Sequence, residues 1–126
     1  MISKVETSNA PAAIGPYSQA TIFGDLIFTS GQIPLSPETG EIIGSDITSQ
    51  AEQAMKNIAG LLDAAGSDLS HVLKTTCFIT DRAHFSAFNE VYASYFTDNK
   101  PARSTVAVKQ LPKDVLVEVE AIAVRK

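Results

Sequence analysis

The stretch VLVEVEAIAV, residues 115–124, decides the fold because its side chains alternate between two characters. Successive side chains of a β-strand point to opposite faces of a sheet. One set of alternate residues is small and apolar, and this set predicts a face covered by helices. Its members are Val115, Val117, Val119, Ala121 and Ala123.

The opposite face of this strand is apolar at both ends and carries two carboxylates in its middle. Its members are Leu116, Glu118, Glu120, Ile122 and Val124. A solvated face would be more polar, whereas the core of a monomer rarely accepts bare carboxylates. A subunit interface that holds a polar pocket would explain both features, and the pattern alone favours it no more than the alternatives.

The rest of the chain predicts one sheet and two helices. Two β-rich runs flank Gly24-Asp25 and predict a hairpin. Apolar residues recur every three or four positions over about 46–65 and about 82–96, which predicts two amphipathic helices. Further strands are expected over 71–80 and 103–108. The order is hairpin, helix, strand, helix, strand, strand, so we expect one α+β domain over residues 1–126, with the helices on one face of the sheet.

The start of the first helix has two possible caps. Ser49 and Glu52 have the spacing of a capping box, but Asp46 could cap the helix instead. Gly66 suits the end of this helix. In the second helix, the aromatic series from Phe85 to Phe96 is expected to form a core stripe.

Composition restricts the possible functions. The chain has 126 residues with 44% hydrophobic and 19% charged side chains, which is typical of a folded globular domain. Neither an apolar run of about 20 residues nor a signal peptide is evident, so a cytoplasmic protein is expected. One cysteine, Cys77, and two histidines do not make a Cys/His zinc site, and we expect no metal. The net charge of −4 argues against nucleic acid as the main partner.

Arg103 stands out in PARSTVAVKQLP, residues 101–112, because it follows a proline at the head of an apolar strand. It could be a surface cation, a structural partner of Glu118 or Glu120, or an anchor for a ligand carboxylate.

Tyr17, after Gly15-Pro16, is by itself more typical of a packing residue with a satisfied hydroxyl. The glycine of Ser30-Gly31 could allow a ligand to approach the backbone or could mark a bulge.

Taken together, the blocks NAPAAIGPYSQA, TSGQIP, KTTCFITD, PARSTVAV and LPKDVLVEVEAIAV resemble the RidA (YjgF-type) family of enamine/imine deaminases. The resemblance covers nearly the whole chain. It implies a chorismate-mutase-like fold with a mixed sheet, and a homotrimer whose sheets surround a central barrel. It also places the ligand pockets between neighbouring subunits.

The resemblance assigns roles to individual residues. It implies that Arg103 binds the substrate carboxylate, that Glu118 orients the attacking water, and that Tyr17 belongs to the catalytic pocket. Substrate-binding positions would be Ser30, Gly31, Asn89 and Thr105. Glu120 matches the glutamate position less well than Glu118. Thr105 departs from the cysteine of many active members, which places any role of a thiol in doubt.

The activity implied by the resemblance is hydrolysis of 2-aminoacrylate, 2-aminocrotonate and their imine forms, 2-iminopropanoate and 2-iminobutanoate, to 2-oxo acids and ammonia. The resemblance implies no cofactor. It links the protein to pyridoxal-phosphate-dependent dehydratases, which release these compounds. Two alternatives stay open: a module that binds 2-oxo acids without turnover, and a ribonuclease or translation inhibitor.

Overall fold

Strand β6 (Val117–Val124) lies inside the sheet, between β3 (Leu26–Thr29) and β4 (Val72–Ile79), and is antiparallel to both. The computed structural model describes residues 1–126. On the helix-facing side of β6, Val117, Val119, Ala121 and Ala123 are buried, as the alternating pattern predicted. Val115, just before the strand, is buried as well.

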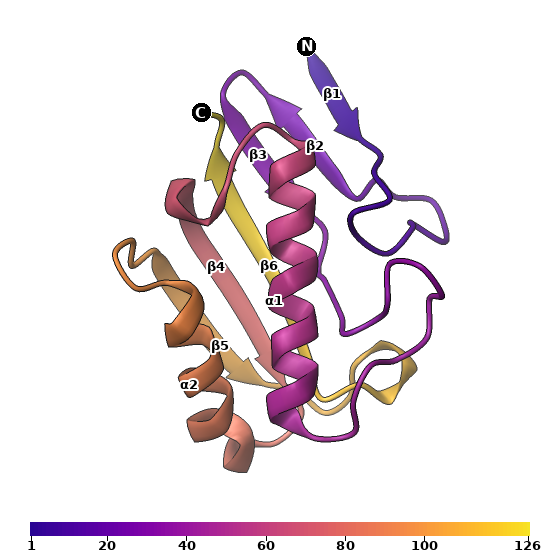
Figure 1. The fold of residues 1–126 in the computed structure, drawn as a ribbon, viewed down its shortest axis with the longest axis vertical. Helices are drawn as coiled ribbons and strands as arrows, with labels where there is room; N and C mark the ends of the chain where they lie inside the picture. Colours follow the sequence, from indigo (N-terminus) through magenta and orange to yellow (C-terminus); the bar gives the residue numbers. More distant parts are fainter.

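The sheet has six strands in the order β1-β2-β3-β6-β4-β5 (Figure 1). The predicted hairpin is formed by β2 (Ala20–Phe23) and β3, which turn at Gly24-Asp25. At the far edge, β5 (Ala102–Ala107) runs parallel to β4, whereas the other pairs are antiparallel. The sheet is therefore mixed, and the predicted α+β class is confirmed.

One strand was not predicted. β1 (Ile2–Val5) pairs with β2 at the other edge of the sheet, with Ile2 opposite Phe23 and Val5 opposite Ala20. Only Val5 of this strand is buried. An edge strand of four residues with one buried side chain leaves little pattern in the sequence, because most of its side chains face solvent.

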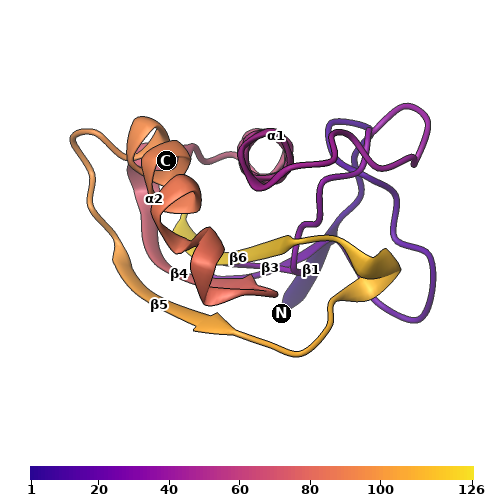
Figure 2. The same ribbon diagram turned by 90° about the horizontal axis from the view of Figure 1, so that it is seen from below.

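Both helices cover the same face of the sheet (Figure 2). Helix α1 (Ile47–Ala64) buries Met55, Ile58 and Leu61 against the sheet, and α2 (Phe85–Tyr95) buries Phe88 and Val91. The described chain contains no helix both long enough and apolar enough to cross a membrane.

Asp46 caps α1, because its carboxylate accepts a hydrogen bond from the Ser49 backbone N–H at 2.8 Å. The capping box of Ser49 and Glu52 is therefore wrong. Glu52 instead accepts a hydrogen bond from the Tyr95 hydroxyl at 2.7 Å and so joins the two helices. Gly66 follows the helix with a φ of 85°, which glycine adopts most readily.

The second predicted helix is divided in two, because residues 82–84 form a 3₁₀ turn before α2 begins at Phe85. The Asp81 side chain caps this turn by accepting from the Ala83 backbone N–H at 2.8 Å. Part of the predicted aromatic stripe is also wrong: Phe85 is 39% exposed, whereas Phe88, Tyr92 and Phe96 are buried.

Gly60 lies on α1 where the loop after β1 crosses the helix. A Cβ atom at this position would overlap with the backbone oxygen of Asn9. In an ordinary helix interior, alanine is about 1 kcal/mol more favourable than glycine. At position 60 we predict the opposite preference, with glycine more favourable than alanine. Gly60→Ala should lower the free energy of unfolding by about 1–3 kcal/mol, the cost of overpacking.

Urea denaturation would measure this effect. Lys56→Gly and Lys56→Ala, at an exposed position of the same helix, give the ordinary difference between the two residues as a matched control. A rise in the unfolding midpoint of Gly60→Ala equal to that control difference would contradict the prediction.

Candidate functional site

The first part of the candidate site is a hollow of about 550 Å³ at the start of β6. Tyr17, Ser30, Gly31 and Glu118 all line it. They come from the loop before β2, the segment after β3, and β6 itself. The structure thus brings together four of the predicted site residues from three separate parts of the chain.

Hydrogen bonds on both sides hold the segment around Gly31 in place. The Ser30 N–H donates to the Gln19 carbonyl at 2.8 Å, and its hydroxyl donates to the Ser18 carbonyl at 2.6 Å. On the other side, Gln32 and Val119 exchange backbone hydrogen bonds at 2.7 and 3.0 Å. Gly31 is therefore held between the loop before β2 and strand β6.

Gly31 leaves the space that the Glu118 side chain occupies. A Cβ atom at position 31 would overlap with the Glu118 carboxylate. This close approach of the Glu118 side chain is a reason for a glycine in addition to the two considered from the sequence, a ligand near the backbone and a bulge.

The Glu118 carboxyl is half-buried and has no cationic partner. Burial raises its pKa above the ordinary glutamate value, and the negative charge of Glu120 two residues away raises it further. The Asp68–Lys126 ion pair lies elsewhere in the structure, where Asp68 also shares a hydrogen bond with His71. Glu118 is therefore a carboxyl group with increased proton affinity, a property that favours a general base over an ordinary surface carboxylate.

Tyr17 enters the same hollow from a loop that Gln19 organises. Gln19 is buried, and its amide group donates to the carbonyls of Thr7, Ala10 and Pro11 at 2.8–3.2 Å. Tyr17 itself is 54% exposed, and its hydroxyl accepts a hydrogen bond from the Ile14 backbone N–H at 3.4 Å. Sequence reasoning missed Gln19, although it belongs to the same GPYSQ block as Tyr17.

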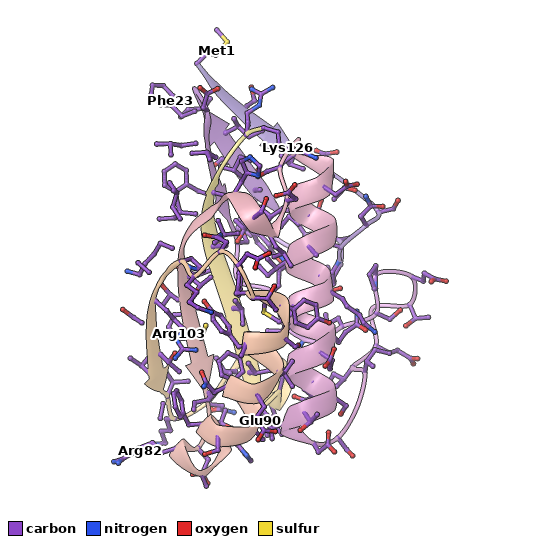
Figure 3. All side chains as sticks on the ribbon, turned by 60° about the vertical axis from the view of Figure 1, so that its left-hand side comes forward. Met1, Phe23, Arg82, Glu90, Arg103 and Lys126 are labelled. Carbon is purple, nitrogen blue, oxygen red and sulfur yellow. The ribbon has the colours of Figure 1, made fainter.

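The second part of the candidate site is a smaller hollow of about 390 Å³ between β5 and α2. Arg103 of β5, at the sheet edge (Figure 3), and Asn89 of α2 line it. An Nη atom of Arg103 donates to the Asn89 side-chain oxygen at 2.7 Å. No carboxylate pairs with Arg103, so the alternative of a structural ion pair with Glu118 or Glu120 is wrong.

Thr105 lies two residues after Arg103, on the same face of β5 and beside Cys77 of β4. Its hydroxyl oxygen is buried and makes no hydrogen bond of ordinary geometry. Cys77 is fully buried, as the sequence predicted, and burial raises the pKa of its thiol to about 11. Because the reactive form of a cysteine is the thiolate, this thiol is unsuited to nucleophilic chemistry.

The two hollows lie on opposite faces of the sheet. Arg103 pairs with Thr75, which is fully buried under the helices, and Arg103 contacts α2 directly. Glu118 pairs with Phe78 on the face without helices, and its strand neighbours Val117 and Val119 point to the helix side. Within one chain, the guanidinium and the carboxylate therefore cannot contact the same small molecule.

Comparison with known proteins identifies relatives over the full length of the chain. Residues 7–125 match the family model described as Endoribonuclease L-PSP. The chain is 46% identical over 129 residues to a 2-iminobutanoate/2-iminopropanoate deaminase of Escherichia coli K12, and the match covers 100% of both chains.

Solved structures agree with this result. A protein of the conserved Rid family from Yersinia pestis, YyfA, is 49% identical with a TM-score of 0.96, covering 98% of this chain and 99% of the other. The E. coli TdcF structure with bound serine is 46% identical with a TM-score of 0.93, and the coverage is again 98% and 99%. The chain therefore belongs to the Endoribonuclease L-PSP family, which includes the RidA (YjgF-type) proteins that its sequence blocks resemble.

Proposed function

We propose that this protein hydrolyses reactive 2-imino and 2-enamino acids to 2-oxo acids and ammonia. One observation carries the proposal: the structure keeps a guanidinium without a carboxylate partner and a carboxylate without a cationic partner. An unpaired, partly buried charge is unfavourable unless a ligand completes its surroundings. A substrate with a carboxylate at one end and a C=N bond at the other would satisfy both groups.

The proposed reaction begins with orientation of the substrate. Arg103 binds the carboxylate through two parallel hydrogen bonds, and the enamine form converts to the imine. Glu118 then takes a proton from a water molecule, whose oxygen forms a bond to C2. The same proton passes to the nitrogen, which leaves C2 bonded to one OH and one NH2 group. The proton of this new hydroxyl then moves to the nitrogen by way of Glu118, the C2–N bond breaks, and ammonia leaves as the C2=O bond forms. C2 of an imine is already electrophilic, so this sequence needs no cofactor.

The named relatives support this class of substrate. The deaminase from E. coli is named for 2-iminobutanoate and 2-iminopropanoate. The serine in the TdcF structure has the three-carbon skeleton and carboxylate of 2-aminoacrylate. We extend both to this chain, and propose as sources the pyridoxal-phosphate-dependent dehydratases that act on serine and threonine.

We further propose that the site forms between two copies of the chain in a homotrimer. Arg103, Asn89 and Thr105 of one subunit would face Tyr17, Ser30, Gly31 and Glu118 of the next. The helix-free face supports this arrangement, because it exposes large apolar side chains such as Phe28 (42%) and Leu26 (37%) on the strand that pairs with β6. Such an exposed apolar face is typical of a subunit contact.

Mixing two inactive variants tests the arrangement. Arg103→Lys lacks the planar donor fork, and Glu118→Gln lacks the base, so each variant alone should be inactive. Unfolding and refolding an equal mixture should restore about one quarter of the wild-type rate, because every mixed cyclic trimer contains one intact site and three-quarters of the trimers are mixed.

The rate measured is the decay of the imine made by a coupled dehydratase, with native mass measurement to establish the trimer. Activity that never returns in a properly mixed trimer would contradict a shared site. Wild-type protein that binds 2-oxobutanoate without accelerating imine decay would support the binding module instead of the enzyme. The ribonuclease alternative rests only on names, those of the family model and of solved relatives described as putative endoribonucleases. The acidic composition of the chain argues against it.

The pH dependence tests Glu118 as the base. Because its raised pKa must be exceeded for it to accept a proton, kcat/KM should fall on the acid side at a pH above the ordinary glutamate value. Removing the neighbouring charge with Glu120→Gln should lower the pKa of Glu118 and shift this acid limb to lower pH. An acid limb that stays in place in Glu120→Gln would show that another group controls it.

Gly31→Ala tests the space beside Glu118. The added methyl group should displace the carboxylate while the fold is retained, since the atoms it meets are the end of a flexible side chain. We expect turnover to fall by at least about tenfold with an unchanged melting temperature, because small displacements of catalytic groups are costly. Gly24→Ala controls for the loss of a glycine away from the site: with a φ of 62° and no atom within contact distance of a Cβ, it should cost some stability through backbone strain but leave turnover unchanged. If Gly31→Ala turns over substrate at the wild-type rate, the space beside Glu118 is not required for catalysis.

A further inference from the structure

The Arg103 guanidinium is held by a cage of neutral side chains that all come from α2. Its central carbon lies 4.6 Å from the centre of the Tyr92 ring and 5.6 Å from the centre of the Phe85 ring. The Asn89 oxygen accepts its hydrogen bond at 2.7 Å. Phe85, Asn89 and Tyr92 are spaced four and three residues apart, which places them on one face of the helix.

Tyr92 is itself fixed in this position. Its hydroxyl shares a hydrogen bond of 2.7 Å with the Thr75 hydroxyl, and both groups are buried. Thr75 is the β4 residue that pairs with Arg103 of β5. The same two strands therefore fix the position of the guanidinium and of the ring that supports it.

The cage positions the charge without neutralising it. The negative face of an aromatic ring attracts a cation, and the attraction is stronger where water is excluded. A carboxylate in the same place would attract the guanidinium more strongly, but it would also occupy the donors that a ligand needs. Rings and one amide oxygen leave further N–H groups free while they restrict the rotamers of a long, flexible side chain.

We infer that Tyr92 is a positioning residue for Arg103, with Phe85 as a weaker second support. Its aromatic face holds the guanidinium ready for an anionic group, and its hydroxyl fixes the ring through Thr75. The nature of that anion, the carboxylate of a 2-oxo or 2-imino acid, rests on the proposed function. The contacts of Arg103 with Tyr92, Phe85 and Asn89 do not depend on the proposed function.

Two substitutions of Tyr92 separate its ring from its hydroxyl. Tyr92→Phe keeps the ring and removes the bond to Thr75, so it should lower the melting temperature but weaken binding of 2-oxobutanoate less than threefold. Tyr92→Leu removes the ring, and the affinity in calorimetry should fall about tenfold, the size of a partly desolvated cation–π interaction. In turnover, Tyr92→Leu should raise KM more than it lowers kcat, whereas a loss of folded protein would lower kcat alone.

Tyr95 supplies the matched control. It lies on the same helix, and its hydroxyl bonds to Glu52 instead of facing Arg103. Tyr95→Phe and Tyr95→Leu should leave the affinity for 2-oxobutanoate unchanged. Phe85→Leu keeps the inference testable if Tyr92→Leu does not fold, because Phe85 is 39% exposed. It should weaken binding about threefold, the lower end of the cation–π range.

Nuclear magnetic resonance of the Arg103 side-chain nitrogens tests the cage without any ligand. The wild-type guanidinium should show separate Nη signals because its rotation is restricted, and Tyr92→Leu should merge them. If the wild type shows separate Nη signals but does not bind 2-oxobutanoate, the cage is supported and the proposed function is contradicted. Unchanged signals and affinity in Tyr92→Leu, or a loss of affinity in Tyr92→Phe as large as in Tyr92→Leu, would overturn the inference.

Discussion

The two-residue period of β6 is the constraint on which the rest of the structure depends. β6 is paired on both sides, so its odd-numbered residues must pack under the helices and its even-numbered residues must face away from them. This assigns Glu118 to the helix-free face and its valine neighbours to the core. A shift of register by one residue would bury two carboxylates, and the cost of burying them unpaired keeps the strand in place.

Periodicity made most of the fold predictable from the sequence. The strict alternation of residues 115–124 and the three-to-four spacing of α1 each have one structural solution that buries the apolar side chains. Strand β1 was missed because only Val5 is buried. The capping box was wrong because Asp46 accepts from the Ser49 backbone N–H, the group that the Glu52 carboxylate would have to reach in a capping box. Spacing alone does not rank two available caps.

The candidate site was less predictable, because its arrangement depends on the register of two parallel strands. No tight turn joins β4 to β5, so the sequence does not show which β4 residue lies beside Arg103. The pairing with Thr75 places Arg103 under α2 and away from Glu118, which the sequence had offered as its partner. Tyr92 was assigned to the core because the same helical spacing serves packing and contact with Arg103.

The placement of Arg103 and Glu118 on opposite faces of one sheet has a consequence for a chain that has folded but not yet assembled with others. If the two groups act on one molecule only across a subunit boundary, a newly made chain is folded but chemically inert. Catalytic competence would then begin with assembly, and specific activity would fall when the protein is diluted below the concentration at which subunits separate. In such an arrangement, the fraction of chains able to catalyse the reaction equals the fraction assembled into oligomers, so a substitution that weakens subunit contacts would also lower activity.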